Sequence, residues 1–358
     1  MAEWYETEDR RTMVETARKF AQAEIVPRLH LESTEPVAFP WEVARKGGEA
    51  GYLSGTLSEE LGGIGLDPLA QALILLHLAE GSAGAAAIFA VHQAAVSALQ
   101  SGAAEIGVRS MLNRMTDQAA SERPELWALA FPDPIAPWHP AEPGAKRYIS
   151  LLTPEVAGRV VVLALEPSRV SCLKAEAAAG AVVRSYPGSG LEEFPTCRLE
   201  LAEKILDPAV VLQGEAAAQA CQAARQALWL LLSAILVGNA RAAARSARAY
   251  ANERVQTGRL IIEHQEVRRK LDTMDMLIEA GLSLVTRTAG RLSEGGLEPA
   301  RQCYLFCGTA AESVCLDAVQ TLGGYGYMKD YGLEKRLRDC KTLQALTNSY
   351  PEDWLGSR

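Results

Sequence analysis

Residues 319–327 read Val-Gln-Thr-Leu-Gly-Gly-Tyr-Gly-Tyr, and they are followed by Arg338-Asp339 and by Leu346-Thr347-Asn348-Ser349. The stretch holds two adjacent glycines, Gly323 and Gly324, and a second such pair stands at Gly62-Gly63. Adjacent glycines permit positive φ and a close approach of the backbone to another molecule, although an ordinary turn has the same composition. The pair at 323–324 therefore needs a second motif before it can be interpreted.

That second motif lies earlier in the chain. Residues 250–259 read Tyr-Ala-Asn-Glu-Arg-Val-Gln-Thr-Gly-Arg, and Gln265 follows after a short gap. Taken alone, Arg254 would more often be a solvated charge at the protein surface than a ligand contact. Only the ordered set of motifs indicates a binding site.

Together the two motifs resemble the acyl-CoA dehydrogenase family, whose members carry Tyr-Ala-x-x-Arg-x-x-Phe-Gly, a short gap, Gln, and later a Gln-x-x-Gly-Gly turn. In relatives the Arg binds the pyrophosphate of FAD, while the Gln and the turn complete the site from a neighbouring subunit. Carried over to this chain, these contacts fall on Arg254, Gln265, Gln320, Gly323 and Gly324. Thr257 replaces the family's Phe, so part of the cofactor wall differs. The resemblance covers nearly the whole chain, most closely over 235–341 and least over 126–212.

The position of the catalytic base departs from the family. Acyl-CoA dehydrogenation removes a proton from the carbon beside a thioester carbonyl while a hydride passes to flavin, so a positioned base is required. Many relatives carry Glu-Gly-Thr where this chain has Thr347, Asn348 and Ser349, and others place the Glu on a long helix, here at Leu228. Neither Thr347 nor Leu228 can accept the proton, while Ser349 stands at an expected cofactor contact. The base is not identified.

The nearest carboxylates to this position in sequence are Glu352 and Asp353. Free carboxylates titrate near pH 4 and need burial to become useful bases near neutrality. We therefore expect a solvated acidic terminus in preference to a shifted catalytic base.

Composition narrows the function classes. The chain has 358 residues, is 48% hydrophobic and carries a formal net charge of -8. A chain of this length usually divides into two or three domains. No run of Lys and Arg alternates with aromatic residues, so we expect no nucleic-acid partner. We find no apolar run of about 20 residues and no signal peptide at the start, and we expect a cytoplasmic protein without a membrane span.

Cysteine and histidine form no pattern typical of a site. The seven cysteines are scattered without a Cys-x-x-Cys pair, so neither a disulfide framework nor a zinc site is indicated. Cys303 and Cys307 lie four apart on an expected helix, where apolar packing is the simpler role. His77 and His92 lie in an Ala- and Leu-rich helical pair, residues 68–101, and a lone His there is more often structural than catalytic.

Hydrophobic periodicity divides the chain into three parts. Residues 8–30 have apolar positions at helical spacing and should stop at Pro27, whereas Arg159–Leu165 is a β-like run, and residues 216–253 are Ala-rich as in a packed bundle. We predict a mainly α protein with a small β domain, of acyl-CoA dehydrogenase type. Its parts are an N-terminal helical domain (1–125), a reduced middle β domain (126–212) and a C-terminal four-helix bundle (213–358).

The middle part retains only remnants of the family's flavin contacts. They are Pro132-Asp133-Pro134 and 144–150, Gly-Ala-Lys-Arg-Tyr-Ile-Ser, with much of the intervening hairpin missing. The ring of Tyr148 could stack on the isoalloxazine and Ser150 could donate a hydrogen bond to it. Tyr-Ile-Ser is also an ordinary strand triplet, and Pro132 stands where a donor hydroxyl is expected.

Three functions remain open. The first is an FAD-dependent oxidoreductase that acts on an acyl-CoA or similar acyl thioester and passes electrons to an electron-transfer flavoprotein. The second is a companion subunit that completes the FAD site of a related acyl-CoA dehydrogenase without catalysing. The third is a structural or acyl-binding relic. The resemblance implies a dimer or tetramer, and heteromeric assemblies with one subunit lacking the base occur in the family.

Overall fold

The N-terminal part of the chain is helical. The computed structural model describes residues 7–28, 37–132, 145–164, 169–179, 181–186, 189–294 and 296–348. The first helices are α1 (Glu8–Phe20), α2 (Trp41–Glu49), α3 (Pro68–Gly81), α4 (Ala83–Gln100) and α5 (Ile106–Gln118). Asp67 caps α3 by accepting from the backbone N–H groups of Leu69 and Ala70, and Ser82 caps α4. Such side-chain caps satisfy N–H groups that a helix start leaves unpaired.

The predicted helix over 8–30 is present in a modified form. The α-helix ends at Phe20, a π-helical segment η1 (Ala21–Ile25) continues it, and a 3₁₀ turn η2 (Val26–Arg28) contains Pro27. The regular α-helix therefore ends before Pro27, whose missing N–H cannot continue the α-helical hydrogen bonding, and the residues after Arg28 lie outside the described ones.

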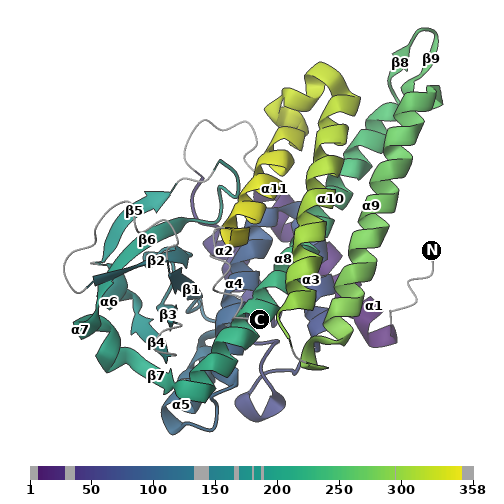
Figure 1. The fold of residues 1–358 in the computed structure, drawn as a ribbon. Helices are drawn as coiled ribbons and strands as arrows, with labels where there is room; N and C mark the ends of the chain where they lie inside the picture. The colour runs from purple at the N-terminus through teal and green to yellow at the C-terminus, as the bar shows by residue number, and fades with distance from the viewer. Residues whose placement is uncertain are drawn as a thin grey trace.

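The middle part is a seven-stranded sheet (Figure 1). Its strands lie in the order β5-β6-β2-β1-β3-β4-β7. The bounds are β1 (Trp127–Pro132), β2 (Ala145–Leu151), β3 (Arg159–Ala164), β4 (Arg169–Lys174), β5 (Val182–Tyr186), β6 (Thr196–Ala202) and β7 (Val210–Gln213), with short helices α6 (Ala175–Ala179) and α7 (Glu203–Leu206). β1 pairs antiparallel with β2 and parallel with β3, so Pro132 lies opposite Tyr148. The connection 133–144 lies outside the described residues.

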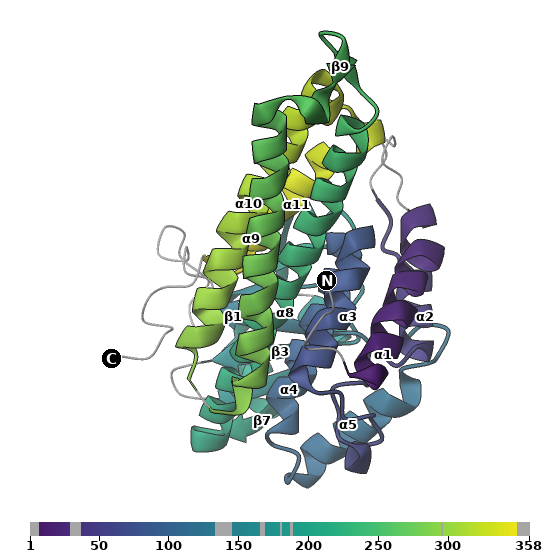
Figure 2. The same ribbon diagram turned by 90° about the vertical axis from the view of Figure 1, so that its right-hand side faces the viewer.

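The C-terminal part is a bundle of four helices, α8 (Gly214–Ala251), α9 (Gln265–Gly290), α10 (Glu298–Leu322) and α11 (Leu333–Asn348). Figure 2 shows that it projects beyond the N-terminal helices and ends at the hairpin of β8 (Val255–Gln256) and β9 (Arg259–Leu260). Helix α8 also packs against α3, where a Cβ at Gly238 would lie 2.1 Å from the carbonyl oxygen of Leu76. The small residues of α8 thus allow one helix to join the bundle to the N-terminal part.

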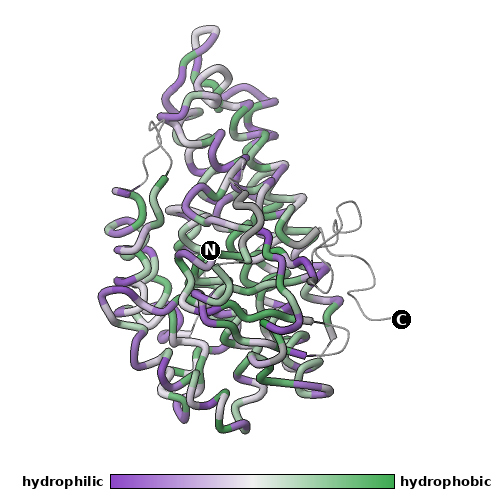
Figure 3. The backbone as a smooth tube through the Cα atoms, turned by 90° about the vertical axis from the view of Figure 1, so that its left-hand side faces the viewer, coloured by the Kyte–Doolittle hydropathy of each residue, from purple (hydrophilic) through white to green (hydrophobic). Residues whose placement is uncertain are grey.

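The apolar residues form one core shared by the three parts. Hydrophobic segments gather in the middle of the molecule, and many outer turns are hydrophilic (Figure 3). By length and composition alone, α4 and α8 could each cross a membrane, but 89% and 94% of their apolar windows are buried inside the protein. Their apolar character is accounted for by this position in the core.

His92 ties three segments of the core together. Its Nδ1 accepts a hydrogen bond from the Trp127 backbone N–H at 3.0 Å, so its Nε2 carries the proton and donates to the Leu53 carbonyl oxygen at 3.2 Å. Burial lowers the pKa of His92 to about 4. The contacts are structural, linking the loop before α3, helix α4 and strand β1.

The predicted fold class, mainly α with a small β domain, is confirmed. The three-domain division remains a proposal. The first strand begins at Trp127 and the long helix α8 begins at Gly214.

Candidate functional site

The far end of the bundle brings the two sequence motifs together. Helix α8 ends there, the hairpin of β8 (Val255–Gln256) and β9 (Arg259–Leu260) follows, and α9 begins at Gln265. The hairpin turns through Thr257 and Gly258, both at positive φ. His264 lies against its base, with Nε2 3.3 Å from the Gln256 carbonyl oxygen and Nδ1 3.1 Å from an Arg259 nitrogen.

Arg254 occupies the junction between α8 and this hairpin. Its backbone N–H donates to the Tyr250 carbonyl at 2.9 Å, and its carbonyl accepts from the Ile261 N–H at 2.8 Å. The residue is exposed. Its backbone is therefore fixed at both ends while the guanidinium group faces outward.

Helix α10 ends beside it at the Gly-Gly turn. Gly323 has φ 60° and ψ -130°, a conformation that is essentially restricted to glycine, and it opens a 3₁₀ turn, η8 (Gly323–Tyr327). A Cβ added at Gly323 or Gly324 would meet no atom of the described residues within 4 Å. The glycines leave open space above the turn, where another molecule can approach the backbone.

Aromatic contacts join the turn to the end of α8. The ring of Tyr325 lies 6.1 Å from that of Tyr250 and 5.4 Å from that of Tyr331, centroid to centroid. We call Arg254, Gln265, Gln320, Gly323 and Gly324 the bundle-end cluster. Arg254, Gln265, Gln320 and Gly324 are exposed, and Gly323 is half-buried.

Exposed apolar side chains surround the bundle-end cluster. Tyr327 is 75% exposed, and the others are Val255, Tyr325, Met328 and Tyr331. An exposed patch of large apolar side chains is typical of a surface that contacts another chain or a ligand. Sequence reasoning missed this patch because aromatic residues next to glycines carry no signal of exposure.

Tyr148 and Ser150 lie elsewhere. Both are on β2 in the sheet, well removed from the bundle end in Figure 1. Tyr148 is buried, and its burial raises the pKa of the phenol to about 12. The Ser150 hydroxyl is buried and donates to the Leu152 carbonyl oxygen at 2.8 Å. The chain does not bring these two residues to the bundle-end cluster, and their flavin contacts remain a prediction.

The two expected base positions are occupied as follows. Leu228 is 1% exposed in α8, with its side chain in the apolar core. Thr347 lies in the last turn of α11. Ser349, Glu352 and Asp353 lie outside the described residues. A carboxylate at position 228 would need a hydrogen-bonding or charged partner, because the surroundings are apolar. The leucine that is present needs no such partner.

The Arg338-Asp339 pair fastens α11 to the connection between β5 and β6. Arg338 binds Glu192 at 2.6 Å, and Asp339 accepts from the Leu191 backbone N–H at 2.6 Å. Lys335 bridges Asp339 at 2.8 Å and Glu193 at 3.1 Å inside the protein. Burial alone would lower the pKa of Lys335, but the two carboxylates outweigh it and raise that pKa. All of these contacts lie within one chain. They hold α11, the helix that carries Thr347, against the residues that connect β5 and β6.

A cavity of about 400 Å³ lies beside the first half of α8, between it, α3 and the end of α4. Ala227, Leu230 and Leu231 line it, together with polar residues that include Thr56 and Gln100. The Thr56 Oγ1 and Gln100 Oε1 atoms are buried with no hydrogen-bonding partner among the described residues. Leu228 is not among the residues that line this cavity. The cavity therefore does not mark the expected position of the base.

Comparison with known proteins agrees with these motifs. Residues 7–117 match the model of the acyl-CoA dehydrogenase N-terminal domain, and residues 223–347 match that of the acyl-CoA dehydrogenase C-terminal domain. The chain belongs to the acyl-CoA dehydrogenase family. The reduced middle part lies between the two matches, where the sequence resemblance was also weakest.

Relatives of this acyl-CoA dehydrogenase family member align over almost its whole length. Probable acyl-CoA dehydrogenase YngJ of Bacillus subtilis is 27% identical over 94% of both chains. Among solved structures, butyryl-CoA dehydrogenase from Megasphaera elsdenii has a TM-score of 0.74 at 19% identity, covering 95% of this chain and 94% of that one. The FAD complex of PigA has a TM-score of 0.77 at 18% identity, covering 96% and 94%. These structures show that the fold is shared.

Proposed function

We propose that this chain is a subunit of an oligomeric, FAD-dependent oxidoreductase that acts on an acyl-CoA or similar acyl thioester. The observation that carries the proposal is the bundle-end cluster, which gathers residues from the end of α8 (Arg254), the start of α9 (Gln265) and the end of α10 (Gln320 and the Gly323-Gly324 turn). Family membership makes FAD the cofactor expected at this site. The proposed location is the cytoplasm.

The chemistry of the bundle-end cluster fits a pyrophosphate. A guanidinium group presents donors in a planar fork that matches phosphate oxygens, and Arg254 is exposed. The open space at Gly323 and Gly324 lets a ligand approach the backbone of the turn. Gln265 and Gln320 add exposed amide groups. These residues would hold the cofactor without supplying any reacting group.

The surroundings favour a site shared between subunits. The exposed patch around the cluster, with Tyr327 and Met328 at its edge, would be covered in an assembly. Strand β2, which carries the expected isoalloxazine contacts Tyr148 and Ser150, lies away from the bundle end in Figure 1, and both side chains are buried in this chain. One chain would thus offer its bundle end to an FAD whose ring system lies on another chain. A dimer or a tetramer satisfies this arrangement.

Bound FAD supplies the hydride acceptor for oxidation of the thioester. This chain's own task would be to orient the cofactor and to exclude water, because neither Thr347 nor Leu228 can remove the substrate proton. The leucine at the buried α8 position specifically favours a second candidate function. In that case the chain is a non-catalytic companion that completes the FAD site of a related subunit which carries the base. An electron-transfer flavoprotein is the proposed acceptor in both cases.

The visible absorption spectrum distinguishes these functions. The chain is purified alone and again after coexpression with a related acyl-CoA dehydrogenase subunit that carries Glu at a base position. A yellow protein alone supports the self-sufficient flavoprotein, and a yellow complex only on coexpression supports the companion. Colourless protein in both preparations, with FAD added in excess, would contradict the proposed function.

A further inference from the structure

The outer face of α10 is exposed and carries no charge. Beyond the first turn of this helix, all of which the structure describes, the exposed residues are Gln302, Leu305, Phe306, Thr309, Ser313, Leu316 and Gln320. They recur every three or four positions, so they share one face of the helix. We call them the α10 stripe. Leu305, Phe306 and Leu316 are 38%, 37% and 49% exposed, and Gln320 belongs to the bundle-end cluster.

Helix α9, which lies beside α10 in Figure 1, has a different surface. Its exposed charged residues are Glu266, Arg268, Arg269, Asp272, Asp275, Glu279 and Arg287. A surface helix usually keeps charged side chains on its solvent face, and α9 follows this rule. The α10 stripe instead has the composition of the core of a protein interface, which is poor in charged residues.

The charged residues that border the stripe are paired within the chain. Glu312 lies 2.9 Å from Lys341 of α11, and Asp317 forms an ion pair with Lys270 of α9. Both carboxylates are therefore neutralised by the neighbouring helices. The face between them presents no unbalanced charge to a partner.

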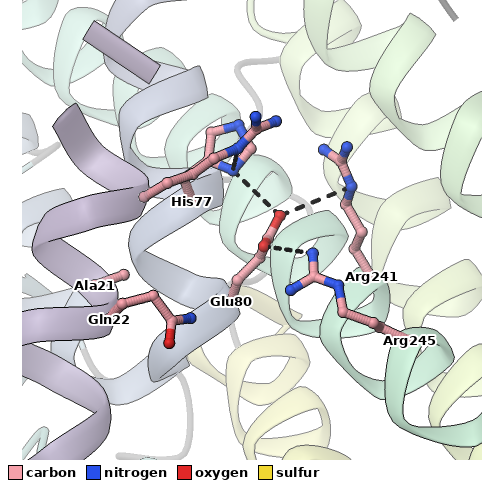
Figure 4. Close-up of a pocket in the computed structure, with 7 residues that line it drawn as sticks. Ala21, Gln22, His77, Glu80, Arg241 and Arg245 are labelled. Carbon is pink, nitrogen blue, oxygen red and sulfur yellow. Dashed lines mark hydrogen bonds and ion pairs between the residues drawn. The ribbon is translucent and has the colours of Figure 1, made fainter. Parts of the chain in front are cut away.

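The polar pocket between α1, α3 and α8 is, by contrast, satisfied within the chain. Figure 4 shows the Glu80 carboxylate with His77 on one side and Arg241 and Arg245 on the other. Glu80 lies 2.6 Å from Arg245, 3.7 Å from Arg241 and 3.1 Å from His77, and Arg18 donates to His77 at 3.3 Å. These groups need no further partner, whereas the apolar side chains of the α10 stripe remain exposed.

Charge identifies the partner of the stripe. The chain has a formal net charge of -8, so two copies repel each other, and their contact costs least where charge is absent. In a two-fold dimer the same patch meets itself, so a charged patch would place like charges opposite each other. The α10 stripe avoids this cost.

We propose that the α10 stripe binds the α10 stripe of a second copy of this chain in a two-fold homodimer. This dimer rests on the proposed function, in which the chain is a subunit of an oligomer, and it makes a second copy one of the partners. The burial of Leu305, Phe306 and Leu316 would stabilise it.

Sedimentation equilibrium over a dilution series tests the proposal. The parent should be a dimer or an assembly of dimers. Leu316→Lys and Phe306→Lys each place two lysines in the contact, one from each copy, and should raise the dissociation constant of the dimer about a hundredfold or more. Far-UV circular dichroism should not change, because both side chains are exposed in the single chain.

Met276→Lys is the matched control. Met276 is 61% exposed on α9, so this variant adds the same charge to a surface that is already charged, and its dissociation constant should equal that of the parent. Arg254→Ala should lose flavin and remain dimeric, which separates a failure of the FAD site from a failure of the dimer.

A monomeric parent would overturn the proposal, as would dissociation constants that are equal in the parent and in both α10 variants. Equal weakening by Met276→Lys would also overturn it. So would α10 variants that still self-associate but no longer bind a coexpressed related subunit, because the stripe would then contact that subunit and not a second copy.

Discussion

At the scale of single residues, Arg254 separates two tasks. Its main chain closes the junction between α8 and the β8–β9 hairpin, while its side chain faces outward. Removing the side chain should therefore spare the fold and affect only a ligand. This separation makes the residue a direct probe of the proposed cofactor site.

Arg254→Ala should lower FAD affinity about tenfold or more, because a charge-assisted hydrogen bond to phosphate is lost. Flavin content after gel filtration at limiting FAD is the measurement. Arg291→Ala, another exposed arginine near the opposite end of α9, is the matched control and should keep its flavin. Equal flavin content in the two variants would remove Arg254 from the site.

His92 makes stability depend on pH. Its buried, neutral ring has a pKa of about 4, below the value of about 6.5 expected in the unfolded chain, so the unfolded state takes up the proton first as pH falls. This group contributes fully to stability above about pH 6.5, and its contribution falls progressively between about pH 6.5 and about pH 4.

Urea unfolding should therefore give a free energy about 2 kcal/mol lower at pH 5 than at pH 7 from His92 alone. His92→Asn should be less stable than the parent at pH 7 and should lack this part of the pH dependence. If the free energy of unfolding changes by the same amount between pH 7 and pH 5 in the parent and in His92→Asn, the pKa of His92 is not lowered in the folded protein.

At the scale of the element, the turn after α10 depends on one glycine more than on its neighbour. Gly323 adopts φ 60° and ψ -130°, whereas Gly324 has no positive φ, and neither is crowded. Backbone conformation, and not packing, therefore decides the effect of substitution at these positions.

Gly323→Ala should destabilise the turn by about 1–3 kcal/mol, because side chains rarely adopt its conformation. Gly324→Ala should change the free energy of unfolding much less and serves as the stability control. Chemical denaturation of the two variants makes the comparison. If they unfold alike, the strained conformation at Gly323 is not maintained in solution.

The sequence predicted local elements well and distant contacts poorly. Helical spacing placed α1, and β-like composition placed β3, because both signals are local. It could not show that β6 lies beside β2 or that Lys335 meets Glu193 across 142 residues, since these contacts arise from tertiary packing. The motifs at Arg254 and Gly323-Gly324 predicted a cofactor site. The alternation of apolar and polar residues along β2 did not predict that the Tyr148 side chain is buried.

At the scale of the whole molecule, the chain separates its expected cofactor contacts between the bundle end and the sheet. We propose that these two sets of contacts serve an FAD shared between chains, because strand β2 lies well away from the bundle end in Figure 1. An assembly can provide both sets while covering the exposed patch around Tyr327. The same assembly could provide the base that Thr347 and Leu228 do not.

The chain purified as a homomer should therefore oxidise straight-chain acyl-CoAs poorly. General acid–base catalysis typically contributes about 10²–10⁴-fold to the rate, so turnover should be lower by a factor of this order than in a relative with the Glu. Steady-state assays with an artificial electron acceptor measure it. Turnover comparable to such a relative would mean that another residue serves as the base.

Any residual activity should not come from the C-terminal carboxylates. The double variant Glu352→Gln and Asp353→Asn should retain the parent's rate, because solvated carboxylates titrate near pH 4 and are weak bases at neutrality. A loss of turnover with unchanged flavin content would instead identify one of them as the base.

The central claim is that this chain contributes to an FAD site at a subunit interface. An experimentally determined structure of the purified assembly with FAD, formed alone or with a related subunit, tests it most directly. The account predicts the FAD pyrophosphate within hydrogen-bonding distance of Arg254 and beside the Gly323-Gly324 turn, with the isoalloxazine ring on a different chain. An FAD held within one chain, an Arg254 remote from the cofactor, or an assembly that takes up no FAD at saturating concentration would contradict it.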